Sequence, residues 1–167
     1  MREALAAEPT LGPSLRATSL PPLLAPLGGP GLSPSAAVGL DLILEGFLLH
    51  HGTPRQLAIP DRGRQVLAGD YCYAAGLVRV ASAGELFMIE ALSSLIAAGA
   101  GLAARGDHAA LAPLWRGTVR AIAGVESGLQ PRYWSAAAAL ERGEPSEFER
   151  LAAELGPTPG LEEALRG

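Results

Sequence analysis

The stretch "RQVLAGDYCYAAGLVRV", residues 64–80, decides the fold. An apolar stripe runs through it and ends one residue beyond it, at spacings of four, three, four and three: Leu67, Tyr71, Ala74, Val78 and Ala81. This spacing is typical of one face of an α-helix. Gly69, Cys72 and Gly76 place small residues on a neighbouring face, where we expect a second helix to approach unusually closely.

The composition favours helices throughout the chain. Of the 167 residues, 49% are hydrophobic, but Ala and Leu carry that share and aromatic residues make up only 5%. Such a mixture favours helix over sheet. The 13 basic and 17 acidic residues give a net charge of -4 without long runs of one sign, so binding to nucleic acid is not expected. A single Cys and the lack of a hydrophobic leader favour a soluble cytoplasmic protein, with at most peripheral membrane contact.

The pattern divides the chain into three parts. Half of the 14 prolines fall within residues 1–34, which indicates an N-terminal arm with at most one short helix at "PPLLAPL". Residues 35–130 are predicted to form a helical bundle core of four helices. The first is capped near Ser33 and the second by Asp61. The third runs from Glu85 to about Arg105 and is apolar nearly all round, and the fourth runs through "ALAPLWRGTVRAIAGVE". The third helix is expected to be central and buried. Residues 131–167 read as solvated C-terminal helices. The sequence thus predicts an all-α antiparallel bundle.

Three acidic residues are candidates for a polar site. Asp41 and Glu45 lie one helical turn apart, an arrangement that suits a hard cation or acid-base chemistry, although a solvated face is the simpler interpretation. Asp70 follows Gly69 inside an apolar helix, so it is either partly buried and hydrogen-bonded or facing a cleft.

The remaining reactive residue types give weaker indications. His50 and His51 are adjacent on a helix and point about 100° apart, which does not suit one metal ion, so no metal site is expected on this chain. Cys72 is expected to be a small core residue, since a nucleophile needs a neighbouring base.

Residues 20 to about 105 resemble the N-terminal half of the trans-polyprenyl diphosphate synthases. The similar segments are "LPPLLAPLGG" (20–29), "AAVGLDLILEGFLLHHG" (36–52) and "VLAGDYCYAAGLVRVASAGELFMIEALSSLIA" (66–97). The resemblance implies part of the isoprenoid synthase fold. It departs from the family where metal is bound: His51 and Gly52 stand where the family has the first two aspartates of DDxxD, Pro21 stands where it has an Arg, and no Asp follows Asp107. Mg²⁺ needs those carboxylates to support the leaving diphosphate.

This pattern of loss is similar to the small, non-catalytic subunit of heterodimeric long-chain synthases such as heptaprenyl diphosphate synthase. By that resemblance, no catalytic residue lies on this chain, and a catalytic partner subunit carries the aspartate-rich motifs, the Mg²⁺ and the prenyl diphosphate used for a quinone side chain. It also implies that Tyr71, Tyr73, Phe87 and Met88 line the subunit interface or the product channel, although residues at helical spacing are more often core.

Two other hypotheses stay open at this point. One is a divergent enzyme that acts alone on prenyl diphosphates through Asp41, Glu45, Asp61 and Asp70. The other is a helical protein-interaction module unrelated to isoprenoid synthesis.

Overall fold

A computed structural model of the chain describes residues 1–83, 86–126 and 128–166. These residues are helical and include no strand, only an isolated bridge between Leu15 and Leu57, which confirms the all-α prediction. The helices are α1 (Arg2–Ala6), α2 (Ala25–Gly28), α3 (Pro34–His51), α4 (Arg62–Ala81), α5 (Leu86–Ala104), α6 (Leu111–Ile122), α7 (Leu129–Glu141), α8 (Ser146–Leu155) and α9 (Pro159–Ala164), with short 3-10 turns at Gly12–Ser14 and Gly29–Gly31. The predicted helix start at Glu85 lies outside the described residues.

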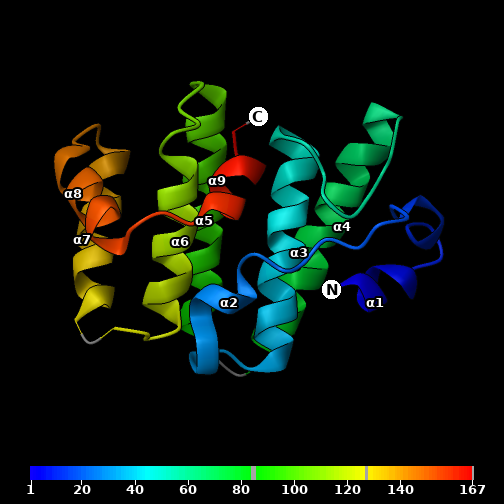
Figure 1. Cartoon of the computed structure of the whole chain (residues 1–167), viewed down its shortest axis with the longest axis horizontal. Helices are drawn as coiled ribbons and strands as arrows, with labels where there is room; N and C mark the ends of the chain where they lie inside the picture. Colours follow the sequence, from blue (N-terminus) through cyan, green and yellow to red (C-terminus); the bar gives the residue numbers. More distant parts are fainter. Residues whose placement is uncertain (84–85, 127, 167) are drawn as a thin grey trace.

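The longer helices stand in a row, with α4 at one end and the pair α7 and α8 at the other (Figure 1). Helix α3 packs against α4 on one side and against α2 and α5 on others. Helix α6 packs against α5 and α7, and the short α9 lies against α6. The chain therefore builds its bundle mostly from helices that follow one another in sequence.

Both predicted N-terminal caps of the long helices are present. The Ser33 hydroxyl accepts a hydrogen bond from the Ala36 N–H at 3.1 Å, at the start of α3. The Asp61 carboxylate accepts one from the Arg64 N–H at 2.8 Å, at the start of α4. Each cap satisfies one of the N–H groups that a helix start leaves without a backbone partner.

Glycines bring α3 and α4 into direct backbone contact. A Cβ added to Gly76 of α4 would lie 2.7 Å from the Gly39 carbonyl oxygen of α3, and a Cβ on Gly39 would lie 2.7 Å from the Gly76 oxygen. About two turns further along α3, a Cβ on Gly46 would lie 3.0 Å from the Gly69 carbonyl oxygen of α4. Only glycine allows two helices to come this close, so the predicted close approach at Gly69 and Gly76 is confirmed.

The face of α4 that meets α3 is therefore its small-residue face, and three of its larger side chains, Leu67, Tyr71 and Val78, face solvent, whereas Val80 is buried in the main core. Leu67 is 69% exposed, Val78 is 63% exposed and Tyr71 is 37% exposed, while Cys72 is fully buried. The larger side chains would hold α3 too far away for the glycine contact. The apolar stripe from Leu67 to Ala81 thus lies on one face of a helix, as predicted, but that face is the one that this chain leaves open.

The C-terminal helices belong to the main core, which corrects the prediction that residues 131–167 are solvated. Phe148 of α8 and Leu161 of α9 are buried in the same apolar cluster as Trp115 of α6. The Tyr133 ring of α7 lies directly against Gly117 of α6, where an added Cβ would be only 2.2 Å from the ring. The Tyr133 hydroxyl lies 2.6 Å from Thr118 Oγ1. The prediction failed because each short helix contributes only a few apolar side chains.

The N-terminal arm is also packed rather than free. Leu24 joins the main cluster, and Leu5 of α1 joins a second cluster with Leu42, Leu49 and Cys72 between the arm, α3 and α4. The predicted short helix in "PPLLAPL" is present as α2, which starts at Ala25. Proline thus limits helix length here without preventing burial.

Helix α5 is less buried than its composition predicts. Its segment Phe87–Ala104 has a mean hydropathy of 1.7, and only 33% of these residues are buried. By length and composition it is the one helix among the described residues that is apolar enough to cross a membrane. The expected central position agrees with the packing of α5 against α3, α4 and α6, but the expected burial is wrong for one face of α5, which stays open.

Candidate functional site

The carboxylates of Asp41 and Glu45, on α3, are buried and hold two loops. Asp41 is 3% exposed and accepts hydrogen bonds from the backbone N–H groups of Leu23, Leu24 and Ala25, at 2.9, 3.1 and 3.4 Å. These N–H groups belong to the chain entering α2. The simpler expectation of a solvated face is wrong for Asp41, because α2 and the arm cover this side of α3.

Glu45 does the same for the loop after α3. It is 1% exposed and accepts from the N–H groups of Arg55, Gln56 and Leu57 at 3.0, 2.8 and 3.0 Å. Burial raises the pKa of both the Asp41 and the Glu45 carboxyls, and the backbone N–H donors oppose that shift. Each carboxylate thus accepts hydrogen bonds from three backbone N–H groups, as a carbonyl of a helix or strand would otherwise do.

Arg55 and Gln56 tie the two loops to each other. The Arg55 guanidinium donates to the Pro21 carbonyl at 3.1 Å, and the Gln56 side-chain amide donates to the Leu20 carbonyl at 2.9 Å. Neither contact has a local sequence signal, because each joins residues more than thirty positions apart. The polar groups at this side of α3 therefore form a structural network around the arm.

Asp70 lies on the surface beside His50, away from Asp41 and Glu45. Its carboxylate is 3.2 Å from His50 Nε2, and its side chain is 63% exposed. This exposure contradicts the partial burial that was one of the two expected environments, although Asp70 does have a polar partner in His50. The structure thus places the three predicted acidic residues in separate surroundings and does not bring them together.

The two adjacent histidines have different neighbours. The His50 ring stacks on Tyr73, with centroids 5.3 Å apart, and the His51 ring packs on Phe47 at 4.8 Å. At the end of α3, the Arg62 guanidinium donates to the backbone carbonyls of Leu49 at 2.9 Å and His50 at 2.8 Å. In the described part of the chain, no group of three or more His, Cys, Asp or Glu side chains is arranged to hold a metal ion.

Cys72 is the core residue that the sequence predicted. It is fully buried between α4 and α3. Burial, with a smaller contribution from Glu45, raises the pKa of the Cys72 thiol to about 12. A thiol with that pKa is not a nucleophile at neutral pH.

The four aromatic and Met candidates for an interface or channel divide into exposed and buried pairs. Tyr71 and Phe87 are 37% and 47% exposed, whereas Met88 is 1% exposed and belongs to the main core. Tyr73 is half-buried and packs against that core. Only Tyr71 and Phe87 are placed to touch another molecule directly.

Tyr71 belongs to an open apolar face that we call the α4 seam. Its residues are Leu67, Tyr71, Ala74, Val78 and Ala81, all exposed. Beside the seam, a cavity of about 320 Å³ lies between α4 and the arm, lined by Tyr71, Leu67, Ile59 and Leu11 among others. The seam therefore ends in an apolar hollow that can accept a side chain.

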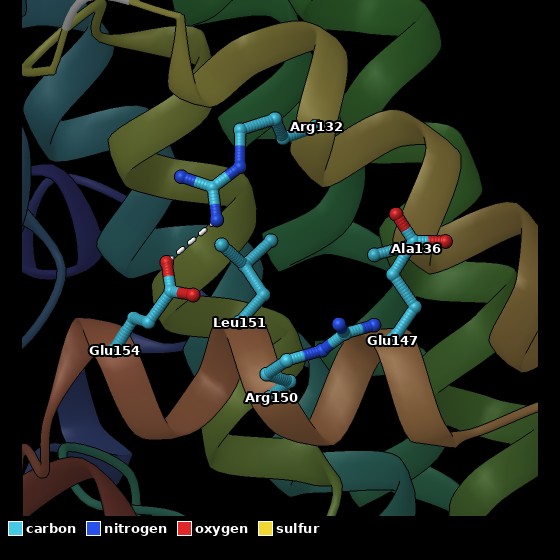
Figure 2. Close-up of a pocket in the computed structure, with 6 residues that line it drawn as sticks. All are labelled: Arg132, Ala136, Glu147, Arg150, Leu151 and Glu154. Atoms are coloured by element: carbon cyan, nitrogen blue, oxygen red, sulfur yellow. Dashed lines mark hydrogen bonds and ion pairs between the residues drawn. The ribbon is translucent and has the colours of Figure 1, made fainter.

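A charged hollow between α7 and α8 was not expected from the sequence. Figure 2 shows Arg132 of α7 reaching Glu154 of α8, at 2.6 Å, beside Leu151. Arg150 and Glu147 line the same cavity of about 200 Å³. The Arg132 and Glu154 side chains are 58% and 50% exposed, so this solvent-screened pair contributes little to stability beyond joining two helices.

No family model, curated protein or solved structure matches this chain. The all-α architecture rests on the structure itself. The resemblance to polyprenyl diphosphate synthases stays a prediction from the sequence.

Proposed function

We propose that this chain is a non-catalytic subunit that binds a helical partner through the α4 seam, and that this partner is the catalytic subunit of a Mg²⁺-dependent polyprenyl diphosphate synthase. The observation that supports the proposal best is that α4 packs its small face on α3 and leaves Leu67, Tyr71 and Val78 exposed on one stripe. The identity of the partner comes from the sequence resemblance.

The geometry of the seam suits a helix. Side chains spaced by four, three, four and three residues form the narrow stripe by which two helices pack side by side. Burying one exposed Leu or Val side chain contributes about 1.5 to 3 kcal/mol before the costs of association. Leu67 and Val78, each more than 60% exposed, are the expected anchors.

The non-catalytic role is supported by what Asp41 and Glu45 already do. Each accepts three backbone hydrogen bonds, so turning either carboxylate toward a metal ion would leave buried N–H groups without acceptors. Such groups cost about 1 to 3 kcal/mol each. On this proposal Mg²⁺ and the prenyl diphosphate are bound by the partner, and the chain is inactive alone.

The test is affinity capture of the tagged chain from its own host, followed by reconstitution with the captured protein. We expect a stoichiometric partner with two aspartate-rich motifs, and Mg²⁺-dependent prenyl transfer only by the pair. Turnover of an allylic diphosphate by the purified chain alone would show instead that it is an enzyme. A stable partner unrelated to isoprenoid synthesis would show that it is a different kind of interaction module.

The α4 seam is tested with matched variants. Leu67→Glu and Val78→Glu place a charge on the seam, and we expect each to raise the Kd for the partner by about tenfold or more. Val125→Glu is the control, because Val125 is 45% exposed and lies after α6, outside the seam. Equal binding by the seam variants and the control would contradict the assignment of this surface.

A further inference from the structure

Helix α5 leaves one face uncovered although the helix carries almost no charge. Between Phe87 and Ala104, Glu90 is its only charged residue, and two thirds of these residues are not buried. Apart from Phe87 and Glu90, the exposed residues of this face are small, namely Ser93, Ser94, Ala97 and Ala104. A second helix can pack closely on a face of small side chains. The open face of α5 is therefore a surface for another molecule.

That face forms the floor of a groove between α5 and α7, which we call the α5–α7 groove. Two cavities, of about 260 and 300 Å³, line up along α5. Ser94, Ala98 and Gly101 are small residues of the floor, while Trp134 and Leu140 of α7 form a wall. A floor of small side chains lets the axis of a second helix approach to about 8 Å.

The two ends of the groove carry opposite charges. Glu90 lines the cavity near the start of α5, and Arg105 lines the cavity at its end. Both residues are exposed, and within the described residues neither forms an ion pair with another side chain. At 1.5 Å per residue they lie about 22 Å apart along the helix.

We propose that the α5–α7 groove is filled by α5 of a second copy of this chain, running antiparallel. With the two-fold axis between Ala97 and Ala98, Glu90 lies level with Arg105 of the second copy, and Ser94 lies level with its Gly101. Small residues then meet at the centre of the contact. Because the two-fold axis repeats every contact, the Glu90–Arg105 pair occurs once at each end of the interface.

The charges also favour a protein over a lipid as the occupant. Glu90 and Arg105 lie on the same open face, and placing either in hydrocarbon is costly. The predicted contact is small. A helix of 19 residues is about 28 Å long and about 10 Å across, so even with α7 the contact stays below the roughly 800 Å² per partner of a stable complex. The dimer is therefore weak, with a Kd in the micromolar range.

Sedimentation velocity of the full chain, from about 5 to about 500 µM, tests this assembly. We expect a reversible monomer–dimer equilibrium. Arg105→Glu puts like charges together at both ends and is expected to raise the Kd about tenfold or more. The double variant Glu90→Arg/Arg105→Glu restores both pairs and should return the Kd to within about threefold of the wild type. Arg150→Glu on α8 is the control, since it changes the net charge equally.

The outcomes separate clearly. A wild-type chain that stays monomeric at all these concentrations would overturn the proposal, and so would equal Kd values for Arg105→Glu and Arg150→Glu or a double variant that does not recover. Flotation of the monomer with neutral phospholipid vesicles would assign the groove to lipid instead and would also overturn it. The proposal does not depend on the α4 seam: Leu67→Glu should leave the self-association unchanged.

Discussion

Gly76→Ala tests the helix contact on which the fold depends. The added Cβ would lie 2.5 Å from Ile43 Cγ1 and 2.7 Å from the Gly39 carbonyl oxygen. The Ile43 side chain has some freedom to rotate, but a backbone oxygen moves only if α3 and α4 separate. Overpacking costs about 1 to 3 kcal/mol, and a contact with a backbone oxygen belongs to the upper part of that range, about 2 to 3 kcal/mol. The better helix propensity of Ala returns about 1 kcal/mol. We therefore expect a loss of about 1 to 2 kcal/mol in the free energy of unfolding.

Urea unfolding followed by circular dichroism measures this loss. With a slope of about 2 kcal/mol per M, the midpoint should fall by about 0.5 to 1 M. Gly63→Ala is the matched control in the same helix, because the nearest atom to its added Cβ is Asp61 Oδ1 at 3.4 Å. That variant should be as stable as the wild type or slightly more stable. A Gly76→Ala midpoint equal to that of Gly63→Ala would refute the close contact between α3 and α4.

Three further predictions concern the buried polar groups. Asp41→Ala should lower the free energy of unfolding by about 2 to 4 kcal/mol in urea titrations, because the amides of Leu23, Leu24 and Ala25 lose their acceptor; an unchanged midpoint would contradict this. Burial raises the pKa of Asp41 and Glu45 above the ordinary 3.8 and 4.5, so the folded state binds protons more readily than the unfolded state. The free energy of unfolding of the wild type, relative to that of Asp41→Asn/Glu45→Gln, should therefore grow as the pH falls from 7 toward 4.5 and 3.8. A difference that shrinks on acidification would show the opposite sign. Cys72, with its pKa raised from 9.0 to about 12, should react with a thiol reagent in native buffer far more slowly than in denaturant, since its thiolate fraction at neutral pH is about a thousandfold lower; equal rates would place Cys72 at the surface.

Local signals in the sequence were sufficient to predict the longer helices and the caps of two of them, but not the short α1 in the arm. Ser33 and Asp61 each stand before an apolar periodic run, and both cap it as expected. Gly69 and Gly76 correctly indicated a close helix contact, because only a missing side chain permits one. What the helical period does not specify is which face meets the rest of the chain, and so Leu67 and Val78 gave no sign of lying in solvent.

The polar residues were harder to interpret for the same reason. Asp41 and Glu45 were expected on a solvated face, since nothing local shows that the arm and the loop at 55–57 cover it. The only available signal was that two carboxylates one turn apart interrupt an otherwise apolar helix. Their partners are backbone amides, which carry no sequence signature at all.

The central proposal, a non-catalytic subunit that binds its partner through the α4 seam, is tested most directly by Mg²⁺-dependent prenyl transfer in a reconstituted pair. The captured partner is assayed with wild-type chain, with Val78→Glu and with Val125→Glu, at chain concentrations that cover the Kd. We expect the wild type and Val125→Glu to support equal activity, and Val78→Glu to need about tenfold more chain for the same activity. Full activity of the partner without this chain, or an equal response to all three, would contradict the proposal.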